Sequence, residues 1–225
     1  MANYRNIVSF IKSKEGGLSS ATTDTASRNP APCGNGSNGK PYHTNKGVTW
    51  ETFSSNASSL GYTASCSNFL NMPDEIWGKI YKQSYWNPMQ GDEIRNQAIA
   101  NSFVEMAWGS GVGGATKFLK QFFKKYYDKS FDNISEIVDY VNKLDEQGQS
   151  PALFEKLYAF RGDKYVSLNQ PSNLKGWINR LNSFYALNKP YAISTKEKTS
   201  AFALVLGIGL IALGGAYLYV RTKRN

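Results

Sequence analysis

The feature that most constrains this 225-residue chain is an uncharged apolar segment near its C-terminal end, TSAFALVLGIGLIALGGAYLYV at residues 199–220. At about 1.5 Å of rise per residue, a helix of this length spans roughly 33 Å, which is enough to cross a bilayer core. Tyr217 and Tyr219 lie where aromatic belts form, and the basic tail 221–225 follows. The alternative, a buried C-terminal helix, would normally keep a polar face. The sequence therefore predicts a transmembrane helix, joined by a linker at 189–198 to the preceding residues.

The basic tail predicts a cytoplasmic C-terminus, with residues 1–195 on the extracytoplasmic side of a single-pass anchor. Lys196 and Lys198 on the near side of the span reduce this asymmetry. Residues 1–17 contain no apolar run long enough for a signal peptide. Export is therefore expected either through the C-terminal span itself or by a specialised route such as phage infection or lysis.

The charge and the residue composition indicate which kinds of ligand and partner are expected. The formal net charge is +9, which favours anionic partners such as a cell envelope or nucleic acid. No dense basic run interleaves with aromatic residues before the C-terminal segment, so nucleic-acid binding is not expected. His43, Cys33 and Cys66 are the only histidine and cysteines, too few for a typical zinc site, and no metal or cofactor is predicted. The two cysteines could form a disulfide in an oxidising compartment, and the sequence leaves this pairing open.

Helical patterns dominate the chain between its two ends. Ile7 and Ile11 lie on one face of a first helix, which Gly16 and Gly17 bring to an end. Residues 18–47 are rich in Ser, Thr, Asn, Gly and Pro and predict a long loop or a small irregular hairpin region. We therefore expect a mainly α fold with one small irregular or β lobe. The further predicted helices cover residues 49–60, 73–86, 93–108, 112–127, 133–147, 151–168 and 176–187.

Glu15 is the strongest catalytic candidate. It continues the stripe formed by Ile7 and Ile11, so its carboxyl is expected to point toward the apolar side of the first helix. It also lies at a helix C-terminus, where the macrodipole disfavours negative charge. Partial burial and the dipole both favour a protonated carboxyl, which general-acid cleavage of a glycosidic bond requires. The alternative is an exposed helix-end glutamate that precedes the glycine pair by chance.

Four blocks in collinear order resemble the glycoside hydrolase family 108 muramidases. The family pattern opens with a helix that ends in EGG, followed by TNKGIT, and its later segments are IY…YWDP…GDDL and a helix pair with NSG. The matching blocks here are SKEGGL with HTNKGVTWETF, IYKQSYWNPMQGDEI, NSFVEMAWGSGVGGATKFLKQ, and LYAFRGDKYVSL with LKGWINRLNSF. The last block resembles the peptidoglycan-binding region that usually closes these proteins.

This resemblance implies a lysozyme-like α+β fold and hydrolysis of the β-1,4 bond between N-acetylmuramic acid and N-acetylglucosamine in peptidoglycan. It divides the chain into a catalytic region at 1–125 and a helical peptidoglycan-binding region at 126–188. The glutamate of the EGG motif, the family's acid, corresponds to Glu15. With the predicted anchor, the implied partners are peptidoglycan and a lipid bilayer.

The chain departs from the family pattern in the loop between EGG and TNKG, which is expanded and lacks a DPGG-like turn. Asp24 is a candidate second carboxylate across the cleft, and a solvated turn aspartate is the alternative. Thr44, at the threonine of TNKG, could orient a nucleophilic water or merely bond to the turn backbone. Glu105 matches an acid of the family's central helix, and we expect it to be half-buried with a structural hydrogen bond.

Aromatic and polar residues beside the motif blocks are candidates for binding sugar rings. These predicted substrate-binding residues are Tyr42, Tyr85, Trp86 and Ser110. Ser110 belongs to a Gly-Ser-Gly run where the family has NSG, so one asparagine amide is missing there. His43 could line the cleft, although a lone loop histidine is more often incidental. Three tryptophans at helical spacing are expected to pack in the core: Trp50, Trp77 and Trp177.

Two other functions remain open on the sequence alone. The expanded loop and the altered Gly-Ser-Gly position also suit a non-catalytic wall-binding or structural protein, such as a component of a phage tail or a contractile injection particle. A chitin-type substrate is a further alternative, because specificity depends on the site and not on the fold. Release of new reducing ends from peptidoglycan distinguishes the muramidase from both.

Overall fold

The computed structural model of the chain describes residues 1–32 and 34–193. The predicted transmembrane helix at 199–220 and Cys33 lie outside the described residues. Among the helices of the described ranges, none combines the length and the apolar character that a bilayer crossing needs.

The described part is mainly helical with one small sheet, as the sequence predicts. The first helix, α1, ends one residue before Glu15 and is followed by the sheet lobe. The helices are α1 Arg5–Lys14, α2 Trp50–Ala57, α3 Cys66–Leu70, α4 Asp74–Tyr81, α5 Gln97–Tyr127, α6 Ile134–Glu146, α7 Ser150–Ser167 and α8 Pro171–Asn188. Short helical turns are η1 Thr25–Arg28, η2 Ser58–Leu60, η3 Lys82–Trp86, η4 Gly91–Glu93 and η5 Lys189–Tyr191.

The irregular lobe predicted at 18–47 contributes two strands to a three-stranded antiparallel sheet in the order β1-β2-β3, and the third strand follows directly after it. Its strands are β1 Leu18–Ser19, β2 Thr44–Asn45 and β3 Val48–Thr49. Lys46 and Gly47 join β2 to β3 with φ angles of 49° and 79°. Two consecutive left-handed residues are typical of a tight hairpin turn, which explains the sequence TNKGVT in this place.

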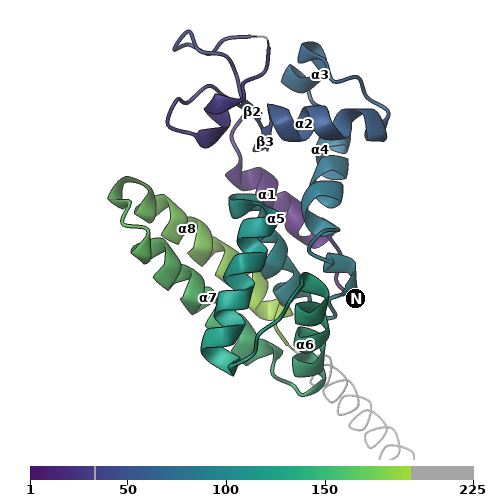
Figure 1. Cartoon of the computed structure of the whole chain (residues 1–225), viewed down its shortest axis with the longest axis vertical. Coiled ribbons are helices and arrows are strands. Elements are labelled where there is room, and N and C mark those ends of the chain that lie inside the picture. The colour runs from purple at the N-terminus through teal and green to yellow at the C-terminus, as the bar shows by residue number, and fades with distance from the viewer. Residues whose placement is uncertain (33, 194–225) are drawn as a thin grey trace, which may run out of the picture.

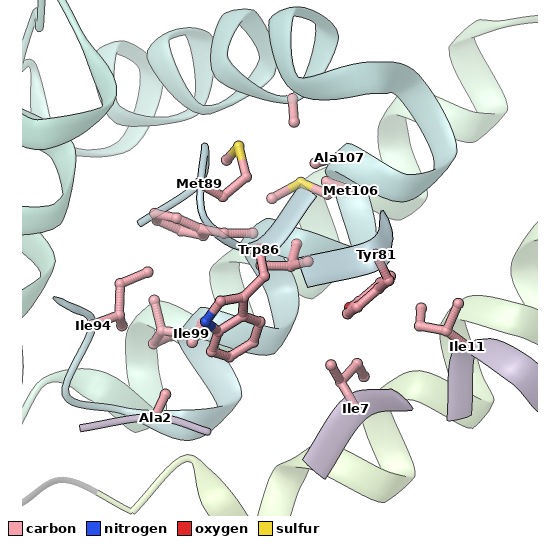
Figure 2. Packing of buried hydrophobic residues seen from close by; sticks show 14 of the residues in the cluster. Ala2, Ile7, Ile11, Tyr81, Trp86, Met89, Ile94, Ile99, Met106 and Ala107 are labelled. Carbon is pink, nitrogen blue, oxygen red and sulfur yellow. The ribbon is translucent and has the colours of Figure 1, made fainter. Parts of the chain in front are cut away.

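Helix α5 lies at the centre of the fold and packs against α1, α6, α7 and α8 (Figure 1). Its N-terminal half is almost entirely buried. Ile7 and Ile11 of α1 are fully buried, which accounts for the apolar stripe of that helix. Figure 2 shows Trp86 enclosed by buried side chains of α1 and α5, among them Ile99 and Met106.

Gly111 interrupts α5 with φ 72° and ψ 159°, a backbone conformation that is essentially restricted to glycine. The chain therefore changes direction within the Gly-Ser-Gly run. This break agrees with the prediction of two helices, one ending at 108 and one beginning at 112.

Helices α7 and α8 form an antiparallel pair beside α5 and contact each other extensively (Figure 1). Both begin with a proline in the first turn, where its missing N–H costs no hydrogen bond. Asn133 caps α6 by accepting a hydrogen bond from the amide of Glu136. Cys66, the first residue of α3, is disulfide-bonded.

Candidate functional site

A groove of about 840 Å³ lies between the sheet lobe and the helices α5, α7 and α8. Its lining includes residues of the β2–β3 hairpin and of both segments of α5. Three acidic residues line it: Glu15, Asp24 and Glu105. A volume of this size lies within the range of pockets that bind small molecules or a few sugar units.

Glu15 reaches the groove because the backbone leaves the helix at this residue. Glu15 is the C-cap of α1, with φ −97° and ψ 136°, and its side chain is 16% exposed. Two donors hold one carboxylate oxygen: Trp108 Nε1 donates to Oε1 over 2.7 Å, and Arg180 Nη1 donates to the same oxygen over 3.0 Å. Within the described residues, Oε2 accepts no hydrogen bond. The carboxyl group is therefore fixed through Oε1 and free at Oε2.

Gly47 of the hairpin lies directly against this carboxyl group. A Cβ atom at this position would lie 2.5 Å from Glu15 Oε2 and 2.6 Å from Trp108 Cζ2. The φ angle of 79° also favours glycine. The glycine of the TNKG motif is therefore needed for two reasons, the turn and the close approach to Glu15.

Aromatic rings surround Trp108 and fix the indole that holds Glu15. The ring of Tyr85 lies 4.8 Å from that of Trp108, and the rings of Trp77 and Tyr81 each lie 5.5 Å away. Burial raises the pKa of the Tyr81 and Tyr85 hydroxyls, so both remain neutral over the physiological range. Trp108 thus has little freedom to leave the carboxyl group.

Glu105 occupies a closed site below the groove. Its side chain is only 2% exposed and forms ion pairs with Arg161 and Arg180, the latter with Nε 2.8 Å from Oε1. Burial by itself would raise the pKa of Glu105, but the two guanidinium groups outweigh it and hold the pKa below its usual value. The prediction of a structural hydrogen bond is confirmed, and the residue is fully buried instead of half-buried.

Arg180 connects the two glutamates, because its Nε donates to Glu105 and its Nη1 donates to Glu15. Burial alone would lower the pKa of the Arg180 guanidinium, but the contacts with both carboxylates raise it. Arg180 was not among the residues predicted from the sequence. The only available signal was an arginine inside the apolar pattern of α8, and that signal does not specify a partner 165 positions away.

The other two predicted catalytic residues also line the groove. Asp24 Oδ1 accepts a hydrogen bond of 3.0 Å from the amide of Ala26 and caps η1. Thr44 Oγ1 is hydrogen-bonded to His43 Nδ1 over 2.8 Å. His43 itself is 1% exposed, so it supports Thr44 from behind and does not line the cleft.

The four predicted substrate-binding residues do not lie together in the groove. Ser110 lines the groove, and its hydroxyl donates to the carbonyl of Met106. Tyr42 and Tyr85 are half-buried and pack against the core outside the groove lining. Tyr85 nevertheless acts on the site indirectly, through Trp108.

Two predictions on tryptophans are wrong. Trp86 is not a sugar-binding residue, because its ring is fully buried and its Nε1 donates to Asp92. Trp177 is not a core residue, because it is half-buried and lines the groove beside Tyr165. The error on Trp177 comes from helical spacing, which identifies a face of a helix but not whether that face meets the core or a groove. The error on Trp86 comes from its place beside a motif block, which does not determine its burial. Trp50 and Trp77 pack as predicted.

No group of three or more His, Cys, Asp or Glu side chains that could hold a metal ion occurs in residues 1–32 and 34–193. Two of the three acids that line the groove, Glu15 and Glu105, contact arginines of the protein. Glycoside hydrolysis commonly uses a pair of carboxyl groups on either side of a substrate groove, and Glu15 and Asp24 both line this one.

Comparison with known proteins agrees with this class. Residues 8–111 match the family model described as Glycosyl hydrolase 108, and this part of the chain is similar to that family of glycoside hydrolases. The matched range contains Glu15, Thr44 and Glu105, whereas Arg161 and Arg180 lie outside it.

The chain also resembles a solved structure, that of Brucella abortus SagA, with a TM-score of 0.58 and 18% sequence identity. The similarity covers 85% of this chain and 97% of the SagA chain, so the two proteins share a fold over nearly the whole described part. A comparison with curated proteins finds no match.

Proposed function

We propose that the protein is a peptidoglycan hydrolase of the N-acetylmuramidase type, which cleaves the β-1,4 bond between N-acetylmuramic acid and N-acetylglucosamine. The similarity of residues 8–111 to a glycoside hydrolase family supports the reaction class. The observation that carries the assignment is the position of Glu15, at the edge of a groove with one carboxyl oxygen fixed and the other free. Glu15 acts as the general acid.

The hydrogen bonds of Glu15 favour one of its two oxygens as the donor to the glycosidic bond. Oε1 accepts from Trp108 Nε1 and Arg180 Nη1, so both donors occupy its lone pairs. The proton that is transferred to the glycosidic oxygen therefore resides on Oε2, beside Gly47. A sugar chain in the groove approaches Oε2 along the hairpin, because the absent side chain of Gly47 leaves that path open.

The oxocarbenium-like centre that forms during cleavage needs a second group. Asp24 and Thr44 line the same groove as Glu15. Asp24 stabilises the positive charge through its carboxylate, or Thr44 orients the attacking water through its hydroxyl, which His43 holds in place. Separate substitution of the two residues distinguishes these roles.

The proposed cellular setting is the extracytoplasmic side of a membrane. It is supported by the apolar segment 199–220 and by the basic tail that follows it. An anchored muramidase suits lysis or wall entry by a phage or a related particle. Fractionation of membranes from cells that express the full chain, with and without residues 199–220, tests the anchor.

The catalytic assignment is tested with purified peptidoglycan and the Glu15→Gln variant. General-acid catalysis contributes about 10² to 10⁴ in rate, so the variant is expected to lose about 10³-fold in turbidity clearing while its circular dichroism is unchanged. Mass spectrometry of the wild-type products is expected to show N-acetylmuramic acid at new reducing ends.

Three outcomes would contradict the proposal. Undiminished clearing by Glu15→Gln would exclude Glu15 as the acid. Anhydro sugars in place of reducing ends would indicate a lytic transglycosylase. Binding of peptidoglycan by the wild type without any new ends would indicate a non-catalytic wall-binding protein.

A further inference from the structure

The groove continues well beyond Glu15 along the helices, and this extension has a different chemical character. Its lining comes from the second segment of α5, from the C-terminal part of α7 and from the first half of α8. We call it the helical end of the groove and define it by six residues: Lys117, Phe118, Gln121, Lys164, Tyr165 and Trp177. None of them belongs to the range that matches the family model.

The helical end carries positive charge that the protein does not neutralise. Lys117 and Lys164 are exposed, and neither forms an ion pair or a side-chain hydrogen bond with any residue that the structure describes. The two arginines of the groove differ, because Arg161 and Arg180 are paired with carboxylates. Glu105 is the lining acid next to the helical end, since Arg161 donates to both Glu105 and Tyr165, and its charge is balanced by Arg161 and Arg180. An anionic ligand is therefore favoured at the helical end.

An aromatic surface lies beside these lysines. The rings of Tyr165 and Trp177 lie 5.5 Å apart at 36°, and both residues are half-buried. Phe118 completes the apolar part of the lining. A half-buried aromatic pair next to two exposed cations suits a ligand with short aliphatic segments between carboxylates.

The glycan of peptidoglycan does not provide such a ligand, since its sugar units are uncharged once the lactyl group is joined to the peptide. The stem peptide does, because it combines alanine methyl groups with free carboxylates. It branches from every N-acetylmuramic acid, next to the bond that a muramidase cleaves. A groove that holds the glycan beside Glu15 therefore has a peptide within reach of its helical end.

We propose that the helical end of the groove is a subsite for the peptide stem of peptidoglycan, in which Lys117 and Lys164 bind peptide carboxylates and Trp177 with Tyr165 contacts the aliphatic portion. This inference rests on the proposed muramidase function and adds a determinant of substrate choice. The enzyme accordingly prefers glycan that carries uncapped, carboxylate-bearing stems.

The test compares two forms of the same substrate, native sacculi and sacculi whose peptide carboxylates have been converted to amides. Exposed ion pairs contribute modestly, so the wild type is expected to show about fivefold to tenfold higher kcat/KM on the native form. In the double variant Lys117→Gln/Lys164→Gln, the ratio of kcat/KM on native sacculi to kcat/KM on amidated sacculi is expected to fall to about one. In Lys117→Arg/Lys164→Arg the preference is expected to persist.

A matched control removes two lysines outside the groove. Lys129 and Lys143 are exposed, and neither lines the groove. Lys129→Gln/Lys143→Gln changes the net charge equally and is expected to keep the wild-type ratio. A ratio that stays at the wild-type value in Lys117→Gln/Lys164→Gln would overturn the proposal, and so would an equal loss on both substrate forms.

A direct binding measurement separates this inference from the muramidase assignment. A stem tripeptide with its three carboxylates free is titrated into the full chain carrying Glu15→Gln, and the indole resonances are followed by NMR. Shifts of the Trp177 resonance that disappear in the double glutamine variant support the subsite, whether or not the wild type cleaves glycan. The absence of binding overturns it even if the wild type is an active muramidase.

Discussion

Glu15 and Glu105 share one arginine but lie in opposite environments. Glu105 is 2% exposed and lies between two guanidinium groups, so both of its oxygens are engaged. Glu15 is 16% exposed, and only its Oε1 is engaged, by Arg180 and Trp108. The closed site fixes a charge for the sake of the fold, whereas the open site leaves an oxygen available for chemistry.

The comparison shows why a glutamate inside a groove is not by itself a catalytic residue. Both acids line the groove and both contact Arg180. Glu15 has one oxygen, Oε2, that accepts no hydrogen bond from the described residues, and Gly47 lies against this oxygen. Each oxygen of Glu105, by contrast, is paired with a guanidinium group. We therefore expect loss of Glu105 to affect stability and loss of Glu15 to affect turnover.

The largest expected effect on stability follows the removal of Glu105. Glu105→Gln leaves the buried Arg161 without a countercharge and leaves Arg180 paired with Glu15 alone, which costs about 3–5 kcal/mol of unfolding free energy. Glu15→Gln leaves Arg180 paired with Glu105, so its cost is expected to stay below about 1 kcal/mol. Urea unfolding of both variants measures the difference. Equal losses would mean that the two sites are not separated as the structure indicates.

The hairpin glycine provides the next prediction. Gly47→Ala places a methyl group against Glu15 Oε2 and Trp108, in a left-handed conformation that costs an alanine about 1–2 kcal/mol. We expect a total loss of about 2–3 kcal/mol in stability, together with at least a tenfold lower rate of clearing because the carboxyl group is displaced.

Gly61→Ala is the matched control for this variant. Gly61 has a φ angle of 76°, and a Cβ atom there would meet nothing within 4 Å. Gly61→Ala therefore has the same unfavourable left-handed backbone conformation as Gly47→Ala, but its methyl group meets no other atom. Similar rates of clearing for the two alanine variants would show that Gly47 acts only through the turn.

Arg180 is expected to matter for turnover as well as for stability. Arg180→Lys cannot contact Glu15 and Glu105 together, because an ammonium lacks the planar fork of donors. We expect about a tenfold loss in kcat with little change in KM, since Glu15 is no longer held through Oε1. Arg161→Lys disturbs the pair with Glu105 and the hydrogen bond to Tyr165 but no contact with Glu15, so its kcat is expected to fall less. Equal kcat values for the two variants would show that Arg180 has a purely structural role.

Much of the fold was predictable from local signals. The break at Gly111, the capping of α6 by Asn133 and the hairpin at TNKG each follow from the chemistry of a few adjacent residues. The placement of Glu15 at the groove also follows, because the apolar stripe of α1 ends one turn before it. These features depend on short-range geometry, which a sequence records directly.

The remainder of the site depends on contacts between distant segments. Arg180 reaches Glu15 from α8, and Arg161 reaches Glu105 from α7, yet nothing in either helix specifies the partner. Trp86 and Trp177 show the same limit, since each lies on an apolar helix face and only the packing decides which one meets a groove. The helical end of the groove is therefore visible only in the folded chain.

The smallest predicted effect is the pH dependence of the closed site. The pKa of Glu105 lies below its usual value of 4.5 in the folded protein, because Arg161 and Arg180 outweigh the effect of burial. A lowered folded-state pKa contributes stability above the unfolded value, and this contribution disappears as the pH falls through the folded value. Stability should therefore decline below about pH 4.5, with a slope of up to about 1.4 kcal/mol per pH unit from this group.

Glu105→Gln isolates that contribution, because a glutamine does not titrate. The difference in unfolding free energy between the wild type and the variant is expected to be constant near neutral pH and to shrink by about 1 kcal/mol for each pH unit below about 4. Asp74, whose pKa the Lys12 and Lys46 side chains also lower, titrates equally in both proteins and cancels in the difference. A difference that stays constant down to pH 2.5 would show that Glu105 takes up its proton at the same pH in the folded and unfolded protein, and that the two arginines do not lower its pKa.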